Sequence, residues 1–140
     1  MEKMVIDAHV ERGRDGLFCV YSNTIYVDKY CFGGYGHSAR EAMDDFRVSV
    51  DSTARRFEEE KGRPAEGLAD AVIEWHFDVP SFFDAHPYLN ATQVAREAGM
   101  NSSQLRHYLC GVAVPRPRTV AKIKEIIGRL AAEMREARIE

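Results

Sequence analysis

Apolar and polar residues alternate along the first part of the chain. From Met4 to Val10 every second position is apolar, which is the period of a half-buried β-strand. An Asp15-Gly16 step then favours a turn, and Leu17–Tyr21 predicts a second strand. Residues 24–32 are β-branched and aromatic enough for a third strand, which the glycine-rich segment 33–36 is expected to end.

Helical periodicity follows. Ser38 and Glu41 have the spacing of a capping box, which predicts the start of a helix that runs to about Glu60. Its apolar stripe is Ala42, Phe46, Val50, Ala54 and Phe57. After a loop over residues 61–67, a fourth strand is predicted by the alternating residues Ile73, Trp75 and Phe77. This order predicts an α+β domain over residues 1–78, a small antiparallel β-β-β-α-β sheet with the helix on one side.

The remaining elements are expected to be helical. Pro80 suits the first turn of a short helix over residues 81–86, whose Phe82 and Phe83 could sit under the helices that follow. Two more helices are expected over residues 91–98 and 102–110. Asn101 is the expected N-cap of the second of these, with Gln104 completing a capping box, and Gly111 is its expected C-cap.

The pair of helices over residues 91–110 has the pattern of a helix-turn-helix. Ala95 lies four residues before Gly99, so that a small residue stands at the helix crossing and a glycine at the sharp turn. Apolar residues around them would lock the pair: Val94, Ala98, Met100, Leu105 and Tyr108. We therefore expect an all-α DNA-binding module over residues 79–140, and an activity of binding rather than catalysis.

A last helix is expected from about Thr119 to Ala137, after an extended loop over residues 112–118. It carries a seam of apolar residues at heptad-like spacing: Val120, Ile123, Ile127, Leu130 and Met134. One interpretation is a dimer contact, which suits a motif that often binds DNA as a dimer. The other is that the stripe packs on the protein's own preceding helices, since the seam is too short for a coiled coil alone.

Charge is distributed unevenly over the 140 residues. Residues 1–88 hold ten Lys and Arg against seventeen Asp and Glu, a net charge of −7. Residues 89–140 hold nine basic against five acidic residues, a net charge of +4. Because basic charge attracts phosphate, this asymmetry favours two modules with different partners and nucleic acid as the partner of the second.

Composition excludes some classes of protein. Apolar residues make up 45% of the chain, enough for a globular core. No apolar run is long enough to span a bilayer, and the first twelve residues lack the apolar core of a signal peptide, so a cytoplasmic location is expected. The cysteines, at positions 19, 31 and 110, are odd in number and widely spaced, which argues against disulfide or zinc frameworks.

With both halves placed, the chain resembles the HicB family of antitoxins, in the variants that carry a C-terminal lambda-repressor-like (Cro or Xre type) helix-turn-helix. In the first half the resemblance rests on the hairpin residues 15–18 and on the segment 33–42, a glycine-containing approach to a helix start. In the second half the matching residues are Thr92, Gln93, Ala95, Gly99, Leu105, Tyr108 and Gly111.

The resemblance implies a first module with a partial ribonuclease-H-like or double-stranded-RNA-binding-like fold. It also implies neutralisation of a small HicA-like mRNA-cleaving toxin and repression of the protein's own promoter. A stand-alone regulator without a toxin partner is the alternative.

Residues of the second predicted helix that do not face the core are the expected DNA readers. Ser103, Arg106 and His107 are the expected base contacts, because serine bonds several base edges and arginine binds guanine bidentately. Ser102 and Gln104 lie nearby. The resemblance implies phosphate contacts from Thr92 and Gln93 at the start of the previous helix. Further phosphate contacts are expected from Arg116, Arg118, Lys122 and Lys124. The alternative interpretation is that these four residues only form an ordinary solvated face.

One such motif reads only a few base pairs, so we expect a homodimer or higher homo-oligomer on a palindromic operator in double-stranded DNA. No catalytic residues, metal site or cofactor are expected. The alternative to a DNA-binding function is a metal-dependent nuclease, which would need clustered carboxylates. Asp7 is the one strand acid in a suitable place, while Asp44, Asp45 and the run 58–60 lie on a predicted helix. His9 and His76 could be neighbours on the sheet's outer face, but two histidines do not make a zinc site.

Overall fold

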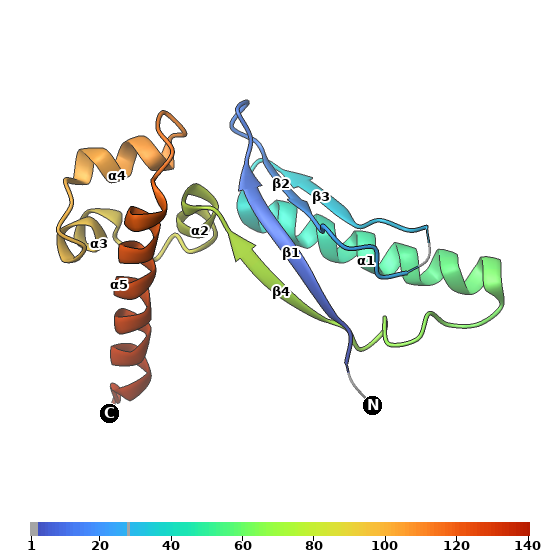
Figure 1. Ribbon diagram of the computed structural model, residues 1–140. Helices are drawn as coiled ribbons and strands as arrows, with labels where there is room; N and C mark the ends of the chain where they lie inside the picture. The colour runs from blue at the N-terminus through green and yellow to red at the C-terminus, as the bar shows by residue number, and fades with distance from the viewer. Residues whose placement is uncertain (1–2, 28) are drawn as a thin grey trace. The chain divides into compact units, whose positions relative to one another are not determined.

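The computed structural model describes residues 3–27 and 29–140, and within them the chain is α+β with four strands and five helices (Figure 1). The strands are β1 (Val5–Arg12), β2 (Phe18–Tyr21), β3 (Gly33–Gly36) and β4 (Val72–Phe77). The helices are α1 (Ala39–Lys61), α2 (Val79–Ala85), α3 (Ala91–Glu97), α4 (Ser102–Leu109) and α5 (Pro117–Glu136). The chain forms two compact units that divide between Ala85 and His86.

The sheet is mixed, in the order β3-β2-β1-β4. Strand β2 is antiparallel to β1 and to β3, whereas β4 is parallel to β1. The expectation of an antiparallel sheet was therefore wrong at one edge. The reason is that α1 carries the chain back along the sheet after β3, so that β4 runs in the same direction as β1. Parallel pairing places Asp7 beside Glu74 and His9 beside His76.

The expected strand over residues 24–32 was wrong, because the described residues of that stretch hold only an isolated bridge between Val27 and Tyr30. The third strand, β3, is instead the glycine-rich segment 33–36 that was expected to end it. A Cβ on Gly34 would lie 2.3 Å from the carbonyl oxygen of Ala42 and 2.6 Å from the backbone nitrogen of Phe46. A Cβ on Gly36 would lie 2.7 Å from the nitrogen of Ala42. These glycines let α1 approach the backbone of the sheet. The requirement comes from tertiary packing, whereas in the local sequence the same glycines indicate the end of a strand.

Ser38 is confirmed as the N-cap of α1, but the expected capping box is not closed, because the Glu41 carboxylate bonds the residue before the cap. The Ser38 hydroxyl accepts a hydrogen bond from the backbone N–H of Glu41 at 3.1 Å, and the Glu41 carboxylate accepts from the backbone N–H of His37 at 2.8 Å. Gly62, in the left-handed region at φ 70°, ends the helix. Of the predicted stripe, Ala42, Phe46, Val50 and Phe57 are buried and Ala54 is half-buried.

The core of the first unit lies between α1 and one face of the sheet. Figure 1 shows α1 running along that face, and the strand residues beneath it are almost wholly buried. They include Ile6, Ala8, Val10, Phe18 and Val20. The alternate residues of β1 and β4 project from the other face, where Val5, Asp7 and Val72 are exposed.

Helix α2 belongs to the first unit, so the observed division lies seven residues after the boundary expected at residue 78. The Asp78 carboxylate accepts from the backbone N–H groups of Ser81 at 2.9 Å and Arg12 at 3.0 Å, which ties the start of α2 to β1. At its other end, Asp84 accepts from the N–H of Ala39, and Arg40 donates to the carbonyl of Ala85, both at 2.7 Å.

In the second unit, α3 and α4 are joined by a turn at Gly99, as predicted. Gly99 has φ 69°, and its N–H donates to the carbonyl of Arg96 while the N–H of Met100 donates to that of Ala95. This pair of bonds is a Schellman motif, which satisfies the last carbonyls of α3 and turns the chain. Ala95 and Leu105 are at most 1% exposed.

Asn101 is confirmed as the N-cap of α4, whereas the C-cap is Cys110 and not the expected Gly111. Asn101 accepts from the N–H of Ser103 at 2.8 Å, and Gly111, at φ 77°, follows the helix end. The expected capping box is wrong, because the Gln104 amide donates to the Tyr108 hydroxyl at 2.8 Å instead of returning to Asn101. An Arg129–Glu97 ion pair joins α5 to α3.

Among the described residues, none of the helices combines the length and the apolar composition that crossing a bilayer would require.

Candidate functional site

Helix α4 presents a polar edge opposite its buried one. Leu105 and Tyr108 are buried, whereas Ser103, Arg106 and His107 are exposed. Within the part of the chain that the structure describes, no hydrogen bond or ion pair engages the Arg106 or His107 side chain. An unpaired guanidinium keeps its five donors for a ligand, so this edge is chemically free to bind a partner.

Two other predicted readers are less available. Ser102 is half-buried, and the Gln104 side chain is held by Tyr108. At the start of α3, Thr92 and Gln93 are exposed, and the backbone N–H of Gln93 donates to the capping oxygen of Asn90 at 3.2 Å. The Gln93 side-chain oxygen also accepts from Arg96 at 3.2 Å.

The four basic residues expected at phosphates are all exposed: Arg116, Arg118, Lys122 and Lys124. Arg116 is the N-cap of α5, and Arg118 and Lys122 lie in its first two turns. Two apolar side chains on the preceding loop are also open to solvent, Val112 at 73% and Val114 at 88% exposure. The loop and the start of α5 thus form an exposed surface with both basic and apolar character.

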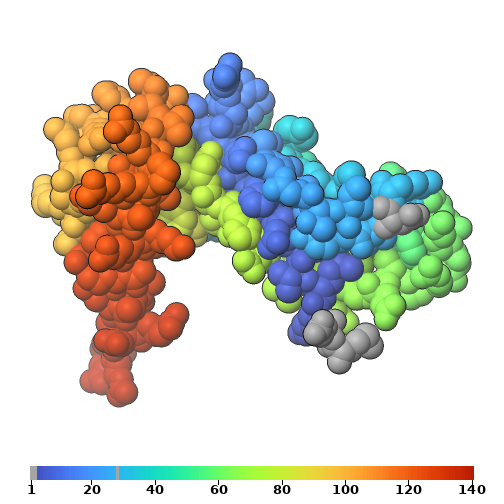
Figure 2. Space-filling model, in the orientation of Figure 1, coloured from blue at the N-terminus to red at the C-terminus, as the bar shows by residue number. Residues whose placement is uncertain are grey.

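The apolar seam of α5 divides into a buried and an exposed part. Ile123 is 4% exposed, and Ile127 and Leu130 are half-buried, while Val120 is 39% and Met134 63% exposed. Ile126, at 9% exposure, is buried although it lies outside the predicted seam. Figure 2 shows the C-terminal half of α5, in red, extending beyond α3 and α4 of the same unit.

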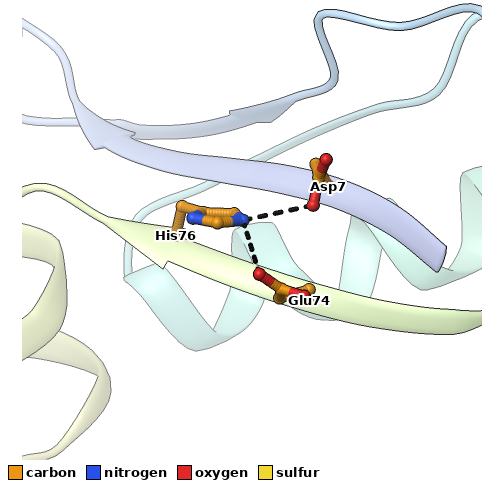
Figure 3. Close-up of side chains that lie close together, drawn as sticks. All are labelled: Asp7, Glu74 and His76. Atoms are coloured by element: carbon orange, nitrogen blue, oxygen red, sulfur yellow. Dashed lines mark hydrogen bonds and ion pairs between the residues drawn. The ribbon is translucent and has the colours of Figure 1, made fainter.

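A second group of polar side chains lies on the open face of the sheet, in the first unit. Nε2 of His76 lies 3.3 Å from a carboxylate oxygen of Asp7 and 3.3 Å from one of Glu74 (Figure 3). These three side chains are 42%, 52% and 60% exposed, respectively. Their ligand atoms all lie within 4.8 Å of one another, and this is the one such group among the described residues.

The His76 ring belongs to a stack of three rings with His9 and Tyr21. The His9 ring stacks on that of His76 with centroids 5.0 Å apart, as expected for cross-strand neighbours, and on Tyr21 at 5.3 Å. The Tyr21 hydroxyl donates to the Glu11 carboxylate at 2.7 Å, and this hydrogen bond raises the pKa of Tyr21 to about 12. Ionising the phenol would place a second negative charge against the carboxylate.

The other acidic residues weighed from the sequence lie on α1, away from Asp7. Asp44 pairs with Arg47 at 2.7 Å, and Asp45 accepts from the backbone N–H of Tyr35 at 2.9 Å. Glu60, from the acidic run, accepts from the Tyr30 hydroxyl. Asp44, Asp45 and Glu60 therefore each have a partner within the fold.

The three cysteines are free thiols. Cys19 is half-buried, and burial raises its pKa, with Glu11, Asp78 and Asp15 adding to the effect. A raised pKa leaves less of the reactive thiolate, which disfavours a nucleophilic role at this position.

Sequence reasoning missed Glu74 as a partner of Asp7. The residues lie 67 positions apart in the chain, and only parallel pairing of β1 and β4 brings them together. The sequence did contain a signal for two of the three residues. Glu74 and His76 are two residues apart in an alternating strand, and therefore share a face of the sheet.

Comparisons with protein-family models, with curated proteins and with solved structures found no match to this chain.

Proposed function

We propose that this protein is a sequence-specific DNA-binding regulator of transcription, of the HicB-like antitoxin and autorepressor type, with a helix-turn-helix formed by α3 and α4. The observation that carries the proposal is the exposed edge of α4. Ser103, Arg106 and His107 face solvent on a short helix whose other edge is fixed by Leu105 and Tyr108. A helix held in this way can enter the major groove with its polar edge toward the bases.

Charge supports the same proposal. The second unit, from His86 onward, carries the basic half of the chain, and its exposed lysines and arginines flank α4 in sequence. Phosphate contacts from these residues would fix the protein's register on DNA, while Arg106 would supply base discrimination. The order β-β-β-α-β in the first unit agrees with the fold that the HicB resemblance implies.

The DNA-bound form would be a homodimer on a palindromic operator. A single α4 spans too few base pairs to select one site, and two copies about one helical turn apart supply the missing specificity. The exposed seam residues Val120 and Met134 provide apolar surface for the contact between copies.

Selection from random double-stranded DNA tests the proposal. The wild-type protein is expected to enrich one palindromic sequence. Arg106→Ala should lose preference for that sequence, with a cost of about 1–3 kcal/mol at the affected base pair. The matched variant Lys124→Ala should weaken binding to all sequences alike and reduce its salt dependence. Enrichment of no sequence, or unchanged preference in Arg106→Ala, would contradict the proposal.

An antitoxin and a stand-alone regulator differ in their protein partner. An antitoxin should be encoded beside a short chain of the HicA-like toxin class, should co-purify with it, and should rescue growth when both are expressed. A stand-alone regulator should purify without such a partner and still select its operator. Co-expression with the product of the neighbouring gene separates the two.

A further inference from the structure

We propose that Asp7, Glu74 and His76 form a binding site for a divalent first-row transition-metal ion, with Zn²⁺ as its representative. The site lies on the sheet of the first unit, whereas the DNA-reading surface proposed for α4 lies on the second unit. It differs from the expectation of no metal site, which considered His9 and His76 but not Glu74.

Hydrogen bonds within this group of three side chains cannot satisfy both carboxylates. Both carboxylates approach the same nitrogen, Nε2 of His76, at 3.3 Å. An imidazole nitrogen carries at most one hydrogen, so it can donate fully to one carboxylate only. The ligand oxygens of the two carboxylates lie within 4.8 Å of each other, so their charges repel, and a cation between them would remove that cost.

The distances suit a shared metal ion. Zinc binds imidazole nitrogen and carboxylate oxygen at about 2.0–2.2 Å, and tetrahedral geometry then separates neighbouring ligand atoms by about 3.4 Å. The observed separations of 3.3 Å from Nε2 to each oxygen fall at this value. The two carboxylate oxygens lie within 4.8 Å of each other, so rotation of the two acidic side chains would bring them to a similar spacing around an ion.

Strand pairing in the sheet fixes the backbone positions of the three ligand residues. Glu74 and His76 are alternate residues of β4, and Asp7 is the registered partner of Glu74 on β1. The backbone N–H of Asp7 donates to the Tyr26 hydroxyl at 2.8 Å, and His9 stacks on the His76 ring. Ligands carried by paired strands lose little freedom when they bind, which favours affinity.

Ligand chemistry selects the class of ion. Mg²⁺ and Ca²⁺ prefer sites made of oxygen alone, whereas an imidazole nitrogen favours zinc and its first-row neighbours. Three protein ligands leave at least one coordination position for water, and the partial exposure of the side chains gives water access to it.

Calorimetric titration of the full chain with zinc chloride tests the proposal. Cys31→Ser and Cys110→Ser are introduced first, because both thiols are exposed and would bind zinc themselves. One zinc ion per chain is expected to bind at this site. His76→Gln should weaken that binding at least about tenfold, as should Asp7→Asn or Glu74→Gln, while the exposed His37→Gln should leave it unchanged.

Nuclear magnetic resonance of the histidine side chains provides a test that does not depend on whether the variants fold. Zinc added to the protein with His76 intact should shift the imidazole resonances of His76 and leave those of His37 in place. Absence of saturable zinc binding, or zinc binding that survives His76→Gln undiminished, would overturn the proposal. Zinc-induced shifts confined to other histidines would overturn it as well.

Discussion

Gly99 shows how one residue sets the geometry of the α3–α4 pair. Its φ of 69° lies in the left-handed region, and a Cβ there would meet no atom within 4 Å. Gly99→Ala should therefore destabilise the second unit by about 1 kcal/mol through backbone strain alone. Urea unfolding followed by circular dichroism would measure the change.

Gly128 provides a matched control. It lies within α5, where a Cβ also meets no atom within 4 Å, and the helical backbone there suits alanine. Gly128→Ala should stabilise the protein by about 0.5–1 kcal/mol. Equal effects of the two substitutions would show that Gly99 is not needed for the turn.

Tyr21 gives a prediction about pH. Its pKa of about 12, against an ordinary 10.0, means that the folded protein favours the neutral phenol. This contribution to stability is complete below about pH 10 and is lost as the pH rises through about 12. Glu11→Gln should bring the pKa of Tyr21 back toward 10, measured by ultraviolet absorbance of the phenolate. Glu66→Gln, an exposed substitution elsewhere, should leave the titration unchanged, and a shift as large as that in Glu11→Gln would contradict the assignment.

At the scale of elements, the packing of β3 against α1 depends on Gly34. A Cβ at this position would lie 2.3 Å and 2.6 Å from backbone atoms of α1, which cannot move alone. Gly34→Ala should destabilise the first unit by about 3 kcal/mol or more, or prevent folding. At the neighbouring Gly33 the nearest atom would be 3.9 Å away, so Gly33→Ala should be nearly neutral. Thermal melts of both variants would compare them, and similar melting temperatures would contradict this role.

The elements that the sequence predicted well are those fixed by local chemistry. Ser38 and Asn101 cap their helices, because each acts on backbone groups within a few residues. Strand β3 was missed because its glycines serve contact with α1, and the direction of β4 because it depends on the crossover between strands. Neither signal lies in the segment itself.

The two candidate sites also differ in whether the local sequence predicts them. The exposed edge of α4 followed from helical periodicity, since burying Leu105 and Tyr108 leaves Arg106 and His107 outside. The Asp7–Glu74 pair required the register of parallel strands, which the alternation of each strand does not specify.

For the whole molecule, we predict a dimer. The chain has a mass of 15.9 kDa, and light scattering at micromolar concentration should give twice that value. Replacing the exposed seam residues, in the double variant Val120→Glu and Met134→Glu, should yield monomers with an unchanged helical spectrum, because buried like charges oppose association. Ala132→Glu, also exposed on α5, should remain dimeric. A monomeric wild-type protein, with and without DNA, would rule out this contact.

The two units also differ in charge, and this difference bears on the partner of each. The acidic first half of the sequence holds the sheet with its carboxylate–histidine group, whereas the basic half holds α3, α4 and α5. A cation and a polyanion are the partners that these charges favour. We therefore propose a separate ligand for each unit.

DNA binding by this protein is best tested by titrating the wild-type chain with labelled fragments of its own genome over a range of salt concentrations. We expect a few fragments, including the one with the protein's own promoter, to bind far more tightly than the rest. We also expect binding to weaken linearly with the logarithm of salt concentration, as phosphate contacts require. Failure to bind any fragment, even in dilute buffer, would contradict the claim that the exposed edge of α4 reads DNA.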